Sequence, residues 1–208
     1  MPGMIIIGFS GIGKSTLSAK SDKFIDLESS CYNLINPNTN KAEKCKDWEK
    51  FYITVAYHLA KQGKYVFVSN HQMVIDEIMN RRIADQTLDQ YPVIFVYPIK
   101  NIKDEWIDKL YKRLNDSIIT GDNEEARKND AAYKAVSQHY DTWVQNLQNI
   151  DPYDNNVYKI PIYNIHYDLE KILLSFIADY NDILKQIDKV TECKVKFDKR
   201  YRKNEEDE

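Results

Sequence analysis

Continuous apolar runs alternate with amphipathic stretches along this chain. Five short runs rich in Ile, Val, Phe and Tyr predict strands, and two of them, at residues 65–69 and 92–97, are apolar at nearly every position. Strands that are buried on both faces have this composition, which is typical of a parallel sheet. The other three runs lie at residues 4–7, 23–27 and 156–162.

Apolar residues at helical spacing occupy the stretches between these runs. The first helix, from Ser15 to Ser21, has room for only about two turns. The second is expected to be capped by Asp47 and ended by Gly63, and further helices are predicted near residues 72–85, from 103, from 133 to 150 and from 169 to 187. Strands and helices in alternation predict an α/β fold, a three-layer parallel sheet of about five strands with helices on both faces.

Three segments interrupt this alternation. Residues 29–46 are rich in Asn, Lys and Cys and are interpreted as an irregular connection that could cover a substrate. Residues 115–130 are mostly polar and are interpreted as the link of a mobile helical lid at about residues 103–150. Residues 191–208 carry mixed charges and are expected to be a disordered tail. One domain of residues 1–190 is therefore predicted.

Residues 8–16 read GFSGIGKST and directly follow the first apolar run. We call them the glycine-rich loop. They fit the Walker A pattern G-x-x-x-x-G-K-[ST] at every fixed position. In that pattern, backbone N–H groups converge on a polyphosphate, Lys14 reaches the β- and γ-phosphates, and the Ser15 hydroxyl holds Mg²⁺. The expected cofactors are ATP and Mg²⁺, and the expected nucleotide-binding residues are Gly8, Ser10, Gly11, Ile12, Gly13, Lys14, Ser15 and Thr16. A turn that binds nothing is the alternative.

Ligands of parallel α/β sheets bind at the carboxyl ends of the strands. The glycine-rich loop and residues 26–30, 69–71 and 97–101 should therefore surround the phosphates. Asp26 and Glu28 share a face of extended chain, so one could hold Mg²⁺ through water while the other accepts a hydrogen bond from a substrate hydroxyl. Ser69 and His71 are further substrate candidates, and Ser15 with Asp26 form the predicted metal site. Partly buried polar side chains and a solvated acidic strand end are the structural alternatives.

Arginines supply the remaining candidates. Arg113 and Arg127 lie in the predicted lid, where guanidinium groups could stabilise the charge that spreads over a transferred phosphoryl group. Arg82 could bind an acceptor phosphate. Each could equally belong to a solvated helix face.

Composition narrows the class of protein. The chain has 208 residues, a formal net charge of -3 and a pI near 5.9, and a general nucleic-acid surface would need clustered positive charge. Cys31, Cys45 and Cys193 are too scattered for a metal site or a disulfide framework and are expected to be reduced thiols. The first apolar run is too short to serve as a signal or to span a membrane. We therefore expect a cytoplasmic protein, monomeric or homodimeric, that acts on a small molecule.

Several segments together resemble a known family. The glycine-rich loop, residues 24–30 and 66–71, Tyr97-Pro98 and the run from Glu105 to Arg113 are similar to the phage-type deoxynucleoside monophosphate kinases of the nucleoside-monophosphate-kinase superfamily. The resemblance covers about residues 4–187. It implies Mg²⁺-dependent phosphoryl transfer from ATP to a nucleoside monophosphate, with Lys14 as phosphate clamp, Ser15 as metal ligand, and Arg113 and Arg127 as lid arginines.

Two departures from the better-known adenylate and guanylate kinases concern the acceptor. The first helix is short, and no clear Asp-Gly-x-Pro-Arg segment is present. A kinase of a nucleoside, sugar or acid therefore stays an alternative, as does an ATPase or switch module. A GTPase is disfavoured, because no glycine has an Asp three residues before it and the Asn-Lys-x-Asp pattern is absent.

Overall fold

The computed structural model describes residues 3–36, 41–150 and 156–205. For residues 33–36, 41–44, 188 and 190–205 it describes the backbone alone. The chain divides into two compact units, Pro2–Tyr167 and Asp168–Glu208. The first unit contains the sheet, and the second is essentially one helix, α6 (Leu169–Glu205).

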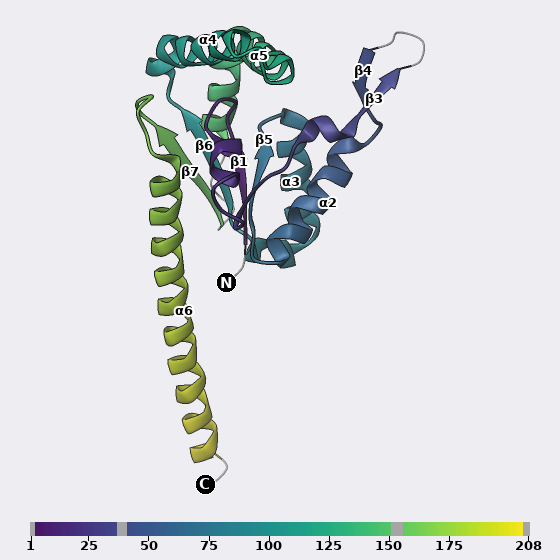
Figure 1. Ribbon diagram of the computed structural model, residues 1–208. Coiled ribbons are helices and arrows are strands. Elements are labelled where there is room, and N and C mark those ends of the chain that lie inside the picture. The colour runs from purple at the N-terminus through teal and green to yellow at the C-terminus, as the bar shows by residue number, and fades with distance from the viewer. Residues whose placement is uncertain (1–2, 37–40, 151–155, 206–208) are drawn as a thin grey trace. The chain divides into compact units, whose positions relative to one another are not determined.

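A five-stranded, all-parallel sheet forms the centre of the first unit (Figure 1). The strand order is β2-β5-β1-β6-β7, with β1 (Met4–Gly8) in the middle. Its neighbours are β5 (Tyr65–Ser69) and β6 (Val93–Pro98), and the edges are β2 (Phe24–Asp26) and β7 (Val157–Ile162). The predicted strands and the α/β class are thus confirmed, and the architecture is consistent with three layers.

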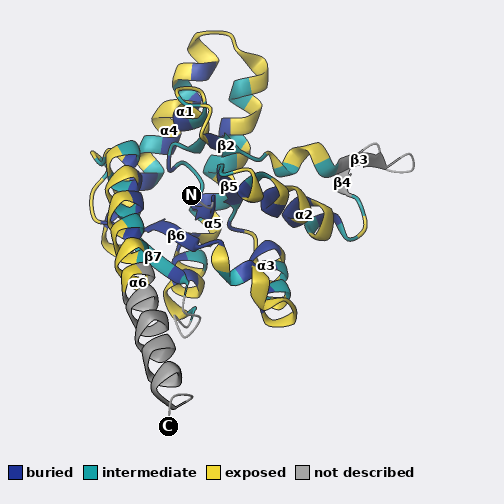
Figure 2. Cartoon of the chain, turned by 90° about the horizontal axis from the view of Figure 1, so that it is seen from below, coloured by how far each residue is buried: buried dark blue, intermediate teal, exposed yellow. Residues whose placement is uncertain are grey.

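Apolar burial explains which runs became the central strands. Every residue of β1 and of β6 is buried, because a strand in the middle of a covered parallel sheet has no solvent face. Figure 2 shows the same burial on the inner side of α2 (Trp48–Lys61), where Trp48, Tyr52 and Ala56 recur at helical spacing.

The remaining helices of this unit are α1 (Lys14–Ser18), α3 (Gln72–Ala84), α4 (Lys103–Ile119) and α5 (Asn123–Asn149). Short 3-10 turns lie at Ser29–Tyr32, Gln86–Gln90 and Lys100–Ile102. The helix α1 has only five residues, fewer than the sequence suggested. Gly63 follows α2 at φ 80°, as expected for a helix-ending glycine. Asp47 stands at the N-cap but makes no side-chain cap, because its carboxylate pairs with Lys50 at 3.0 Å.

The segment of residues 29–46 is not irregular throughout. It contains an antiparallel hairpin of β3 (Asn33–Asn36) and β4 (Lys41–Lys44), paired from Asn33↔Lys44 to Asn36↔Lys41. Its Asn, Lys and Cys content was interpreted as an irregular connection, although Asn-rich segments also occur in hairpins. Residues 37–40 lie outside the described part of the chain.

The predicted polar link of residues 115–130 is also mostly helical. Only residues 120–122 separate α4 from α5, with Gly121 at φ 73° and the Asp122 carboxylate accepting from the Glu125 backbone N–H at 2.9 Å. Polar residues there occupy exposed helix faces, and a polar face does not end a helix. Inside the pair, the buried Asn129 amide donates to the Ser117 hydroxyl at 3.3 Å.

Helix α6 likewise continues to Glu205, through residues for which the sequence suggested a disordered tail. The Lys, Arg and Glu residues of this segment are good helix formers.

Tyr52 ties together the ends of two strands. Its hydroxyl, on a fully buried side chain, donates to the Leu27 carbonyl at 2.7 Å and accepts from the Ser69 N–H at 3.0 Å. Leu27 directly follows β2 and Ser69 ends β5. One phenol therefore satisfies two backbone groups where these strands stop.

Replacing Tyr52 by Phe should lower the free energy of unfolding by about 1–3 kcal/mol, because a half-buried carbonyl and a half-buried N–H lose their hydrogen bonds to the phenol. Urea denaturation measures this change. Tyr65→Phe is the matched control, since no hydrogen bond to the Tyr65 hydroxyl is found among the described residues, and it should cost much less. Equal losses in the two variants would contradict the bridging role.

Candidate functional site

A cleft of about 480 Å³ opens at the carboxyl ends of β1, β2 and β5. The glycine-rich loop, residues 26–29 and residues 69–71 line one side, and residues of α4 and α5 line the other. This volume lies in the range of small-molecule sites. Three of the four segments expected here are present. The fourth, residues 97–101, is not among the described lining residues, and the Ile99 carbonyl instead accepts a hydrogen bond from Tyr140 of α5 at 2.8 Å.

The glycine-rich loop needs its glycines for stated reasons. Gly11 and Gly13 have φ values of 83° and 99°, which side chains disfavour. A Cβ at Gly11 would also lie 2.6 Å from Leu110 Cδ2 of α4, and one at Gly8 would lie 2.8 Å from Lys14 Cδ. A side chain at Gly11 would therefore collide with α4, and one at Gly8 would collide with Lys14.

Two aromatic side chains hold the outer carbonyls of this loop. Trp106 Nε1 donates to Ser10 O at 3.0 Å, and the Tyr167 hydroxyl donates to Ile12 O at 2.8 Å. Because C=O and the following N–H of a trans peptide point in opposite directions, the N–H groups of Gly11 and Gly13 are turned away from the two rings. No recognisable signal in the sequence points to this role of Trp106 and Tyr167.

The two rings are themselves fixed by stacking. Their centroids lie 5.7 Å apart at an interplanar angle of 5°, and Lys109 Nζ lies 4.8 Å from the Trp106 centroid and 4.6 Å from that of Tyr167. Lys109 also donates to the Tyr167 hydroxyl at 3.1 Å. Burial lowers the pKa of Lys109 and raises that of Tyr167 from their ordinary values.

Lys14 reaches back over the loop. Its ammonium donates to Gly8 O at 3.0 Å and lies 3.5 Å from Phe9 O. Burial lowers the pKa of Lys14, and the negative charges of Asp26 and Glu28 partly oppose this shift. The charged group is thus held near two carboxylates but without a direct ion pair to either among the described contacts.

Asp26 and Glu28 form an acidic edge of the cleft. Burial raises the pKa of Asp26 above its ordinary value, and the nearby Lys14 charge opposes the rise. Glu28 is exposed and accepts from the Ser30 hydroxyl at 3.3 Å. Within the described part of the chain, no three His, Cys, Asp or Glu residues gather as a metal cage. Mg²⁺ needs only one or two carboxylates beside phosphate oxygens and water, so Ser15 with Asp26 fits it.

Residues 69–71 line the cleft beside this edge. Ser69 Oγ lies 3.2 Å from His71 Nδ1, and the His71 ring meets Trp48 edge-on at 6.0 Å. Asn70 is only 9% exposed, and its Nδ2 has no hydrogen-bond partner among the described residues. A buried amide donor without a partner is costly, and it marks a place where a ligand oxygen could bind. Sequence reasoning gave this residue no role.

The two lid arginines have different positions. Arg113 of α4 lines the cleft and pairs with Glu125 of α5 at 2.5 Å. Arg127 is exposed and is not among the described lining residues, whereas its neighbour Lys128 lines the cleft and pairs with Glu124 at 3.0 Å. Adjacent helical residues point about 100° apart, so Arg127 and Lys128 lie on different faces of α5.

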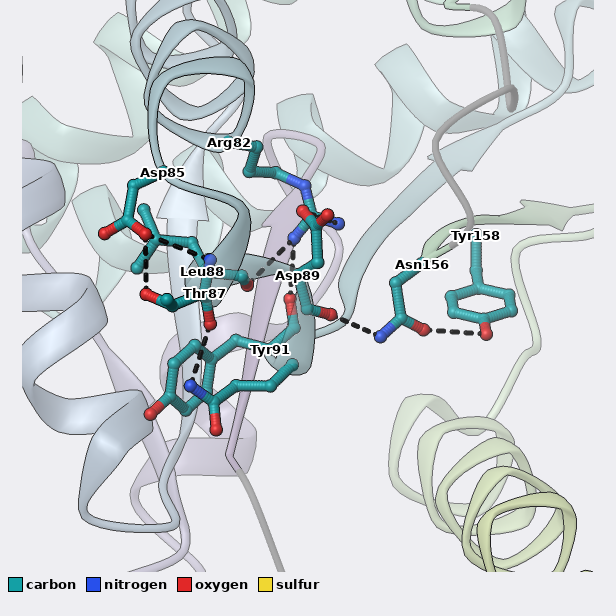
Figure 3. Close-up of polar contacts among 9 residues, drawn as sticks. Arg82, Asp85, Thr87, Leu88, Asp89, Tyr91, Asn156 and Tyr158 are labelled. Atoms are coloured by element: carbon teal, nitrogen blue, oxygen red, sulfur yellow. Dashed lines mark hydrogen bonds and ion pairs between the residues drawn. The ribbon is translucent and has the colours of Figure 1, made fainter. Parts of the chain in front are cut away.

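Arg82, expected to bind an acceptor phosphate, lies elsewhere (Figure 3). Its side chain is buried, and its guanidinium donates to the carbonyls of Leu88 and Tyr91 at 3.2 and 2.9 Å and pairs with Asp89 at 3.2 Å. Asn156 donates to the Asp89 carbonyl at 2.6 Å from the start of β7. Arg82 thus secures the turn before β6, which corrects its assignment as a substrate residue. The sequence around Arg81 and Arg82, at the end of α3, does not indicate which of the two side chains is buried.

Comparison with protein-family models, with curated proteins and with solved structures finds no match to this chain. A search of the described helices for a segment of membrane-spanning length and apolarity also finds none. The function is therefore argued from the geometry of the cleft.

Replacing Arg82 by Ala should destabilise the fold by about 2–4 kcal/mol, because buried carbonyls lose a charged donor. Nucleotide-induced thermal stabilisation should persist in this variant, since Arg82 is outside the cleft. The exposed Arg127→Ala is the control and should change the unfolding free energy by less than about 0.5 kcal/mol. Loss of nucleotide stabilisation in a folded R82A protein would restore the substrate role.

Replacing Asp26 by Asn should stabilise the protein at neutral pH. The folded-state pKa is raised, so the stability that Asp26 contributes at low pH is lost as pH rises from the unfolded to the folded pKa. The neutral amide avoids that loss, and its advantage should shrink below about pH 4, where unfolded Asp is also protonated. Thermal melts at pH 3.5 and pH 7 test the sign, and a larger advantage at pH 3.5 would refute it.

Proposed function

We propose that this chain is a P-loop kinase that transfers the γ-phosphoryl group of ATP to a small molecule in the presence of Mg²⁺. The observation that carries the proposal is the position of Lys14. Its ammonium sits on two carbonyls of the glycine-rich loop, inside a cleft that also holds two carboxylates. A ligand polyphosphate would replace weak carbonyl partners of Lys14 by charged ones, which gives stronger hydrogen bonds.

Each part of the cleft has a task in this reaction. The N–H groups of the loop bind the phosphates, with Trp106 and Tyr167 holding the opposite carbonyls. Ser15 and Asp26 would hold Mg²⁺, which would supply positive charge to offset the negative charge of the phosphates. Arg113 lies across the cleft and can turn from Glu125 to the transferred group. Lys128, in place of Arg127, is the second cation on that side.

The two walls of the cleft carry different kinds of side chain. Small side chains of α5, namely Ala131, Ala132 and Ala135, leave space opposite the loop, and Trp143 closes one side. A nucleoside monophosphate is the acceptor that the sequence resemblance implies. Hydroxyl-bearing small molecules are the alternative within the same reaction class.

Replacing Lys14 by Ala should lower phosphoryl transfer by on the order of 10²-fold, because Lys14 follows the charge that develops on the γ-phosphate. The melting temperature without ligand should stay the same or rise, since the variant no longer buries a charge whose only described hydrogen-bond partners are two carbonyls. Thermal shift with Mg²⁺-ATP and product analysis check both statements.

The exposed Lys20→Ala is the matched control for Lys14→Ala and should behave as the wild type. Near-normal transfer by the Lys14 variant would contradict the proposal, as would a wild-type protein that Mg²⁺-ATP and its analogues do not stabilise. An unfolded Lys14 variant would show that this lysine supports the fold instead.

A further inference from the structure

We infer that the acceptor of this transfer is an uncharged, hydroxyl-bearing small molecule that binds at the acidic edge of Asp26 and Glu28, and that a nucleoside monophosphate is not the acceptor. The inference rests on the proposed function. It concerns the part of the cleft that residues 26–29 and 69–71 line, and it follows from the charges and the unpaired donor found there.

The first argument is the charge at that end. An acceptor phosphate carries almost two negative charges at neutral pH and needs paired cations, most often arginines. The described residues that line the strand side beyond the loop are residues 26–29 and 69–71, and two of them, Asp26 and Glu28, are carboxylates. A dianion placed beside them would meet like charge, whereas a hydroxyl would meet hydrogen-bond acceptors.

The second argument is that the cations nearby already have partners. Arg113 pairs with Glu125, and Lys128 pairs with Glu124. Arg113 is the only arginine among the described lining residues, and the donor's γ-phosphate also requires it.

The third argument is an unmet hydrogen-bond donor. The Asn70 amide is nine-tenths buried, lines the cleft, and has no partner for Nδ2 among the described residues. It directly follows β5, which pairs with β2, the strand that ends in Asp26. An amide donor and carboxylate acceptors at the ends of paired strands suit a group that both accepts and donates, as a hydroxyl does.

The acceptor hydroxyl reacts in one balanced step. Its oxygen forms a bond to the γ-phosphorus, and the bond from that phosphorus to the β–γ bridging oxygen breaks, with the electron pair leaving on ADP. The hydroxyl proton passes to a carboxylate of the acidic edge. The products are ADP and the phosphate monoester of the acceptor.

The first experiment uses the full chain with Mg²⁺-ATP and matched acceptors. One panel contains nucleosides, hexoses and polyols, and the other contains the 5′-monophosphates of the same nucleosides. Mass spectrometry reads the products. We expect monoesters to form in the first panel and no diphosphates in the second. Conversion of any nucleoside monophosphate to its diphosphate overturns the inference while leaving the proposed kinase function intact.

The second experiment uses Glu28→Gln, for which the two acceptor classes predict opposite signs. With a hydroxyl acceptor, the variant loses a charged hydrogen-bond acceptor, and KM for the acceptor should rise about tenfold or more while thermal stabilisation by Mg²⁺-ATP stays unchanged. With a phosphate acceptor, the variant loses a repulsive charge and the KM should fall.

Asp76→Asn is the charge-matched control for Glu28→Gln, because Asp76 is exposed on α3 and is not among the described lining residues. It should leave the KM for the acceptor unchanged. A fall in KM with Glu28→Gln, or an equal rise with Asp76→Asn, refutes the assignment. A wild-type protein that Mg²⁺-ATP does not stabilise refutes the proposed function instead, so the two failures are distinguishable.

Discussion

The hydrogen bonds from Trp106 and Tyr167 to the glycine-rich loop are the contacts on which the cleft depends. A loop with two positive-φ glycines has many conformations when unconstrained, and its N–H groups converge only if its carbonyls are held outward. The carbonyls of Ser10 and Ile12 have buried or half-buried aromatic donors, which are fixed by their mutual stacking. The chain thus organises a backbone site with side chains from residues about 100 and 150 positions later in the sequence.

Burying the charged side chains of Lys14 and Asp26 in the cleft lowers the free energy of unfolding. Lys14 and Asp26 are both shifted toward their neutral forms by burial, although each is opposed by the charge of the other. Structural ion pairs usually show the reverse, because direct contact favours the charged forms. Asn70 adds an unpaired buried donor to the same place. Groups that are poorly satisfied without a ligand, gathered in one cleft, are what a binding site requires and what a core avoids.

Much of the fold could be predicted because burial determines it. Each of the five strands coincides with an apolar run, and their parallel arrangement follows from runs that have no solvent face. The hairpin β3–β4 and the continuous helices α4 and α5 were missed, since polar residues on an exposed face look the same in a helix, a hairpin or a loop. The site could likewise be predicted only in part. The Walker A pattern fixes backbone geometry over nine adjacent residues, so it could be recognised, whereas Arg82, Arg127 and Trp106 depend on which way one side chain faces after folding.

Helix α4 carries Trp106, Leu110 and Arg113, and this spacing has a mechanical consequence. Trp106 and Leu110 contact the glycine-rich loop, and Arg113 follows on the same side at the cleft. Seven residues of helix span about 10 Å, a length that a helix changes only by bending or unwinding. The helix therefore fixes the distance between Trp106, which holds the loop, and the backbone of Arg113. When the helical pair moves, this distance stays constant, and only the side-chain torsions of Arg113 can adjust the reach of its charge toward a bound phosphate.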